Sequence, residues 1–190
     1  MAAEQTICMK QRLADALKAE MSDKPLDKIT VRSLTERCGV NRQTFYYHFD
    51  DIYDLLKWIY GHEIIALLEN VESADTWKES LMLFFNYLDE NKHFCRNTLN
   101  SAGYTHLRTL LRGIINGIVK KYILFFTDGV FPDADFMDFL INYYTISIGS
   151  VAESYLRGEL HQTPSMIVKY LEQIIEIHKN SFTNTERTSE

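Results

Sequence analysis

The 190-residue chain has the composition of an ordinary globular protein, with 46% hydrophobic and 24% charged residues. Its three cysteines are far apart in the sequence, which argues against a disulfide framework and favours a reducing cytoplasm. We find no secretory signal and no apolar stretch of membrane-spanning length. The charge is uneven: residues 1–50 hold eight Lys and Arg against seven Asp and Glu, whereas residues 51–190 hold twelve against nineteen. A mildly basic N-terminal end on an acidic body is compatible with a nucleic-acid partner.

Helical periodicity dominates the sequence, and no segment alternates convincingly like a strand. The pattern predicts an all-α protein of about nine helices. We expect them at 7–21, 31–38, 42–48, 52–68, 77–87, 94–99, 107–126, 136–156 and 167–178. We divide the chain into a three-helix unit (1–50), a larger helical bundle for ligand or partner binding and dimerisation (51–183), and a polar tail (184–190).

The segment Cys38-Gly39-Val40 separates two short helices and predicts a helix-turn-helix. Thr30 and Asn41 are good N-caps for the two helices, and Gly39 can adopt the positive φ that a tight turn needs. The apolar positions around the turn can close a small core: Ile29, Val31, Leu34, Val40, Phe45 and Phe49. The residues left to face outward on the second helix are Asn41, Arg42, Gln43, Thr44, Tyr46, Tyr47 and His48.

The chemistry of this outward face suits DNA. Arg42 can donate two hydrogen bonds to a guanine edge, and Gln43 can pair with adenine. Thr44 and the tyrosine hydroxyls can hold phosphate oxygens, which fixes the register of the protein on the duplex. An alternative is that Tyr46, Tyr47 and His48 only pack beside the helix hairpin.

The segment "ITVRSLTERCGVNRQTFYYHFDDIYDLL", residues 29–56, resembles the N-terminal domain of the TetR family of transcriptional regulators. The resemblance implies a homodimer that binds a double-stranded DNA operator through one recognition helix per subunit, with an effector-controlled C-terminal domain. The free N–H groups near Thr30 and Asn41 also favour anions, and Thr30 and the cation Arg32 complete the candidate DNA contacts.

The sequence departs from the family where a lysine often follows the recognition helix, because Asp50 and Ile52 stand there. Cations nearby could compensate: Lys24, Lys28, Arg32 and Arg37. A second hypothesis is therefore a regulator-like interaction module that has lost DNA binding.

A narrower resemblance involves "FYYHFDDIYDLLKWIY", Trp77 and "NYLDENKHF". These segments are similar to regulators of dihydroxyacetone kinase operons, among which control through a partner protein is one arrangement. The resemblance leaves open whether the effector is a small molecule or a protein, and whether the chain represses or activates.

The last two long helices carry apolar faces wider than one buried stripe. A four-helix interface between two subunits would explain the excess, and an intrachain core is the alternative. The candidate dimer residues are Phe139, Tyr143, Ile146, Gly149, Ser150, Ile167, Leu171, Ile174 and His178.

Polar residues among the aromatic residues of the bundle could orient a small effector. The candidates are Trp77, Phe84, His93, His106, Asn116 and Asn142, although satisfied core polar groups and surface residues explain them equally well. Two possible metal-binding motifs are incomplete. His62-Glu63 could begin a zinc-protease motif, but residue 66 is alanine where the second histidine is required. The Asp133–Asp138 segment resembles the start of a calcium loop but lacks the required glycine and glutamate. We expect no catalytic activity, no cofactor and no metal.

Overall fold

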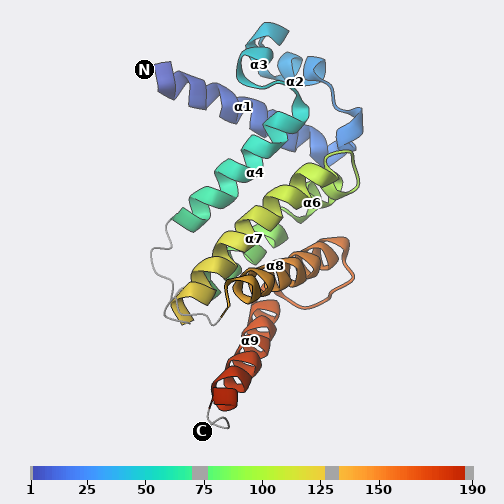
Figure 1. Cartoon of the computed structure of the whole chain (residues 1–190). Coiled ribbons are helices and arrows are strands. Elements are labelled where there is room, and N and C mark those ends of the chain that lie inside the picture. Colours follow the sequence, from blue (N-terminus) through green and yellow to red (C-terminus); the bar gives the residue numbers. More distant parts are fainter. Residues whose placement is uncertain (1, 70–76, 127–132, 187–190) are drawn as a thin grey trace.

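The computed structural model describes residues 2–69, 77–126 and 133–186, and within these ranges every regular element is helical (Figure 1), which confirms the predicted fold class. The elements in chain order are α1 (Ala2–Asp23), η1 (Leu26–Lys28), α2 (Val31–Cys38), α3 (Arg42–His48), α4 (Ile52–Glu69), α5 (Trp77–Glu90), α6 (Lys92–Leu99), α7 (Tyr104–Phe126), α8 (Ala134–Arg157) and α9 (Pro164–Glu186). The sequence did not predict the 3-10 turn η1. The predicted polar tail is helical as far as Glu186, and the remainder lies outside the described residues. Within those ranges no helix has both the length and the apolar character needed to cross a bilayer.

Helices α1 and α4 hold the N-terminal unit on the bundle (Figure 1). Leu13, Leu17 and Met21 recur at helical spacing on one face of α1, and all three are fully buried. On α4, Leu55 and Ile59 are buried to the same extent. Burying one such side chain stabilises a protein by about 1.5–3 kcal/mol. Because the apolar core runs without interruption from α1 through α4 into the bundle, the N-terminal unit shares its interior with the rest of the molecule.

A second contact, which we call the joint, connects η1 and the end of α1 to the α6–α7 corner. The Asn97 side chain on α6 donates to the carbonyl oxygens of Met21 and Lys24, each at 2.8 Å, and accepts from the Leu26 N–H at 2.9 Å. Gly103 lets the α6–α7 corner lie close to η1 and α4, because a Cβ at this position would be 3.1 Å from side-chain atoms of Leu26 and Leu56. The joint therefore fixes where the N-terminal unit sits on the bundle.

Candidate nucleic-acid interface

Local capping explains why α2 ends where the predicted turn begins. The Thr30 hydroxyl accepts from the Ser33 N–H at 3.1 Å, and the Ser33 hydroxyl accepts from the Thr30 N–H at 3.3 Å. At the other end Gly39 has φ 64° and ψ 33°, a left-handed conformation that glycine adopts without a steric penalty. Both the N-cap and the glycine turn confirm the sequence prediction.

The next helix, α3, is capped by Asn41, whose side-chain oxygen accepts from the Thr44 N–H at 2.8 Å and from the Thr44 hydroxyl at 3.0 Å. Its buried side is small, as expected: Phe45 is fully buried and Phe49 nearly so. The Phe49 ring contacts Trp58 of α4, with centroids 6.0 Å apart. The predicted core around the turn is confirmed, with Val31 and Val40 at its half-buried margin.

The opposite side of α3 faces solvent. Tyr46 is 57% exposed and Tyr47 is 79% exposed, and Arg42 and Gln43 are exposed as well. Among the described residues none of these four side chains hydrogen-bonds to protein, so all their donors are available to a ligand. The alternative in which the two tyrosines only pack against the hairpin is therefore wrong.

His48 and Thr44 differ from those four, since both are half-buried. The Thr44 hydroxyl is already engaged by Asn41. The His48 ring lies edge-on to Tyr47 at 4.9 Å between centroids. Burial, together with the nearby Lys10 ammonium, lowers the pKa of His48, so its imidazole is neutral near pH 7. It can donate or accept a hydrogen bond, but it adds no positive charge.

Lys10 is a cation that sequence reasoning missed. It lies on α1, 5.3 Å from the centroid of Phe49 and 5.9 Å from that of Trp58, so the fold brings it beside the end of α3. Two of the compensating cations are already paired: Lys24 with Glu20 at 2.6 Å and Arg32 with Glu36 at 2.6 Å. The Arg32–Glu36 pair is exposed, so it contributes little and can exchange for phosphate, whereas the Glu20 carboxylate paired with Lys24 is buried.

The acidic pair after α3 has a structural role. The Asp51 carboxylate accepts from the Asp54 N–H at 2.8 Å, and the Asp54 carboxylate accepts from the Asp50 N–H at 3.3 Å. The two contacts cap the start of α4, where a negative charge also favours the helix dipole. Capping therefore gives the Asp51 carboxylate a structural role at the start of α4.

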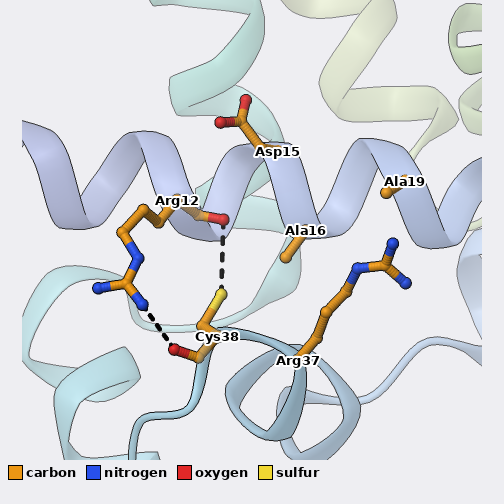
Figure 2. A pocket seen from close by; sticks show the side chains of 6 residues that line it. All are labelled: Arg12, Asp15, Ala16, Ala19, Arg37 and Cys38. Carbon is orange, nitrogen blue, oxygen red and sulfur yellow. Dashed lines mark hydrogen bonds between the residues drawn. The ribbon is translucent and has the colours of Figure 1, made fainter.

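A groove lies between α1 and the C-terminal end of α2, next to the Cys38-Gly39-Val40 turn (Figure 2). The Arg12 guanidinium donates to the Cys38 carbonyl oxygen at 2.7 Å, and the Cys38 thiol donates to the Arg12 carbonyl oxygen at 3.4 Å. Burial raises the pKa of the Cys38 thiol, so it remains protonated and unreactive. These contacts tie the C-terminal end of α2 to α1.

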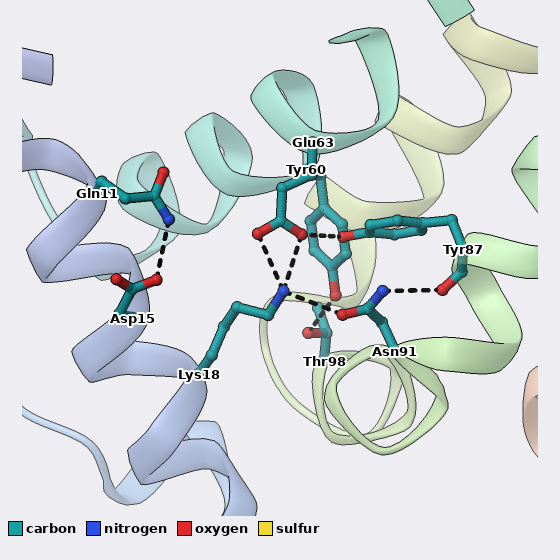
Figure 3. A network of polar contacts seen from close by, with 8 residues as sticks. All are labelled: Gln11, Asp15, Lys18, Tyr60, Glu63, Tyr87, Asn91 and Thr98. Carbon is teal, nitrogen blue, oxygen red and sulfur yellow. Dashed lines mark hydrogen bonds and ion pairs between the residues drawn. The ribbon is translucent and has the colours of Figure 1, made fainter. Parts of the chain in front are cut away.

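Polar contacts also join the N-terminal unit to the bundle (Figure 3). The Lys18 ammonium on α1 bonds both carboxylate oxygens of Glu63 on α4, at 2.8 and 2.9 Å, and the Asn91 side-chain oxygen at 3.0 Å. The Tyr87 hydroxyl donates to the same carboxylate at 2.8 Å, and burial raises the pKa of Tyr87, so it stays protonated. One carboxylate thus links α1, α4 and α5.

Four of the nine predicted dimer residues are exposed apolar side chains, three of them in a row on α8. On α8, Phe139 (65% exposed), Tyr143 and Ile146 recur at helical spacing, with Gly149 and Ser150 continuing the row. On α9, Ile174 is exposed and Leu171 half-buried. Ile167 was wrongly placed in this set, because it is 4% exposed and faces the chain's own core, where α9 packs on α5. The side chain of His178 lies outside the described residues.

The predicted effector residues are spread over the bundle, on α5, α6, α7 and α8. Trp77 lines an apolar cavity of about 20 Å³ between α5, α7, α8 and α9, and Phe84 is fully buried. Asn116 is half-buried and donates to Thr145 at 3.4 Å, whereas Asn142 is exposed on α8.

The two predicted histidines are exposed as well. His93 lies on α6, and the His106 ring stacks on Tyr53, with centroids 5.4 Å apart. The grouping was therefore wrong for His93 and His106, which lie on the surface.

Comparison with known proteins matches both halves of the chain. The family model described as "Bacterial regulatory proteins, tetR family" matches residues 13–59, and "Transcriptional regulator C-terminal region" matches residues 75–177. The chain is 26% identical over 185 residues to the HTH-type dhaKLM operon transcriptional activator DhaS of Lactococcus lactis subsp. lactis, covering 93% of this chain and 96% of that protein. A solved structure, the dihydroxyacetone kinase operon activator DhaS, superposes with a TM-score of 0.73 at 21% identity, over 92% of this chain and 97% of that chain.

All of these descriptions are of transcriptional regulators, in agreement with the expectation that the chain is not an enzyme. The C-terminal match alone spans more than half of the 190 residues, and the second match covers the helix-turn-helix described above. The chain is a member of the TetR family of bacterial regulatory proteins.

Proposed function

We propose that the protein is a homodimeric transcriptional regulator that reads a palindromic operator with α3 and responds to an effector bound by its helical bundle. The observation that carries this proposal is the solvent-facing side of α3. A turn capped at both ends presents Arg42, Gln43, Tyr46 and Tyr47, and none of their side chains hydrogen-bonds to the described part of the chain. We place the protein in the cytoplasm, with the DNA that it binds.

In this proposal the residues divide into two groups. Arg42 and Gln43, in the first turn of the recognition helix, read base edges in the major groove. The remaining predicted residues position the helix on phosphates or support it: Thr30, Arg32, Asn41, Thr44, Tyr46, Tyr47 and His48. Lys10 joins the phosphate-binding group because the fold places it beside α3. Because positive charge supplies much of such binding, affinity will fall as salt is raised.

Two substitutions distinguish recognition of base edges from contact with the phosphate backbone. Arg42→Ala should reduce discrimination at one base pair by about 1–3 kcal/mol. Tyr47→Phe should weaken all sequences alike, by roughly 0.5–1.5 kcal/mol, because it removes one hydrogen bond to the backbone. Selection of bound sequences from a random DNA pool, followed by mobility shifts on the recovered operator and on single-base variants, measures both effects.

A control variant removes a charge far from the turn. Lys120→Ala, an exposed position on α7, should leave base preference and affinity unchanged. Recovery of no shared motif by the wild-type protein, at low salt as well as at physiological salt, would support the module without DNA binding. Unchanged binding by both Arg42→Ala and Tyr47→Phe would show that α3 is not the reading helix.

We expect the subunits to associate through the α8 and α9 rows, which places two α3 helices on half-sites about 34–36 Å apart. Phe139→Glu buries a charge in this interface and should shift the protein to monomer in sedimentation velocity runs. Thr105→Glu, an exposed position on α7, introduces the same charge and should leave the dimer intact. Dimers that tolerate Phe139→Glu would place the interface elsewhere.

A second, narrower candidate is an activator of a dihydroxyacetone kinase operon. It is favoured by the similarity to DhaS, which spans nearly the whole of both chains. In this version the effector acting on the bundle is a small molecule or a partner protein. The operator recovered by selection tests the idea, because a match upstream of kinase genes would support it and its absence there would count against it.

A further inference from the structure

A pocket between α6, α7 and α8, open to solvent at the exposed side chains of Arg108 and Arg112, is lined differently from the apolar cavity beside Trp77. Its volume is about 70 Å³. That is room for about five water molecules, and a larger ligand would extend out of the open pocket past the exposed arginines. Two arginines and two hydroxyl-bearing residues contribute to its lining: Arg108, Arg112, Thr145 and Ser150. A space of this size and polarity suits a small, charged, hydroxylated compound.

The two arginines lack acidic partners. Arg108 and Arg112 are one helical turn apart on α7, and among the described residues neither forms an ion pair with a carboxylate. Arg112 reaches the Asn142 side-chain oxygen at 3.5 Å, and Arg108 lies 6.0 Å from the centroid of the Tyr104 ring. Like charges at this spacing repel, so an anion between the two guanidinium groups would relieve the repulsion.

The carboxylate in the lining does not cancel this charge. Glu153 accepts from the Arg157 guanidinium at 2.8 and 3.1 Å, and the Tyr104 hydroxyl lies 3.3 and 3.4 Å from its two oxygens. Its negative charge is thereby compensated outside the pocket. Across the pocket from the two arginines, the buried Thr145 hydroxyl accepts a hydrogen bond from the Asn116 side chain at 3.4 Å. The hydroxyl proton of Thr145 is therefore left for a bound ligand.

We propose that this pocket binds a small hydroxylated oxyanion, either a phosphate monoester or a carboxylate. The planar guanidinium groups of Arg108 and Arg112 match both anions in shape and charge. The buried Thr145 hydroxyl hydrogen-bonds the hydroxyl of the ligand. Binding at the site is independent of DNA, and only its role as the effector site rests on the proposed regulatory function.

The place of the pocket in the fold gives the bound anion a route to the N-terminal unit. Leu99 of α6 forms part of its lining. Two residues earlier on the same helix, Asn97 holds the end of α1 and the start of η1 through the joint. A shift of α6 on binding would therefore act directly on the element that positions α3.

The test uses the full-length ¹⁵N-labelled protein without DNA. The arginine side-chain N–H signals are followed during titration with glycerol 1-phosphate, glycerate, inorganic phosphate and, as the neutral match, glycerol. The Arg108 and Arg112 signals should shift saturably with one or both organic anions. A response to glycerol 1-phosphate alone would identify a phosphate site, and a response to glycerate alone a carboxylate site. No saturable shift with either organic anion overturns the proposal, as does an equal response to glycerol.

Substitutions locate the site. Arg108→Gln and Arg112→Gln should each weaken binding at least tenfold, whereas Arg96→Gln, an exposed arginine of α6 outside the pocket, should not. An equal loss in Arg96→Gln would show non-specific attraction and overturn the site. Operator affinity is measured separately, with and without the anion. Saturable anion binding without any change in operator affinity overturns the effector role. Failure of the protein to bind DNA in both states overturns only the proposed function.

Discussion

Replacing Phe45 by alanine is expected to lower the free energy of unfolding by about 3–5 kcal/mol, the largest effect that we foresee in the N-terminal unit. The Phe45 ring is fully buried and contacts Phe49, with centroids 5.9 Å apart. Helix α3 has only seven residues, so it depends on this packing rather than on its own propensity. Chemical denaturation followed by circular dichroism measures the loss, and operator binding should disappear with it.

Tyr47→Ala is the matched control, because it truncates an aromatic ring two residues away on the exposed side of the same helix. With 79% of the residue in solvent, its removal should change stability by no more than about 0.5 kcal/mol. Operator affinity should nevertheless fall. If Tyr47→Ala destabilises the protein as much as Phe45→Ala, then the assignment of inner and outer sides of α3 is wrong.

Replacing Asn97 by alanine should have the second-largest effect. The change leaves two carbonyl groups and the Leu26 N–H without their partner, and each buried polar group left unsatisfied costs about 1–3 kcal/mol. Because the site is only partly buried, water can replace some of these bonds, and we expect a total of roughly 3 kcal/mol. Thermal unfolding measures the loss.

The same variant tests whether the joint transmits an effector signal. In Asn97→Ala, the difference in operator affinity between ligand-bound and ligand-free protein should shrink, while anion binding at Arg108 and Arg112 persists. Asn100→Ala, at an exposed neighbouring position in the same segment, should change neither stability nor response. A full response in a destabilised Asn97→Ala protein would mean that the joint only stabilises the fold.

The helix-turn-helix could be predicted because its signals are local. Thr30, Gly39 and Asn41 act on atoms within a few residues, so their capping and turn roles follow from residue type and spacing. The alternation of buried and exposed positions on α3 follows from helical periodicity in the same way. The fold class and the exposed side of α3 therefore follow from the sequence alone.

The misses involve contacts between residues far apart in the chain. Asn97 bonds to groups 71–76 residues earlier, and Lys10 reaches the end of α3 only because α1 folds back across it. Periodicity marks α9 as apolar but does not say which part faces α5, which is why Ile167 was placed in the interface. In the same way, residue type does not distinguish a surface histidine such as His93 from one inside a cavity.

The two tryptophans of the chain fall in different places. The Trp58 ring stacks on His62 at 4.8 Å between centroids and contacts Phe49 at the end of α3. The Trp77 ring lies 4.7 Å from that of Tyr122, buried in the bundle. Intrinsic fluorescence therefore contains two separable reporters, one for each end of the molecule. Single Trp→Phe variants would show, without any attached dye, whether an effector disturbs the bundle first and the DNA-facing end afterwards.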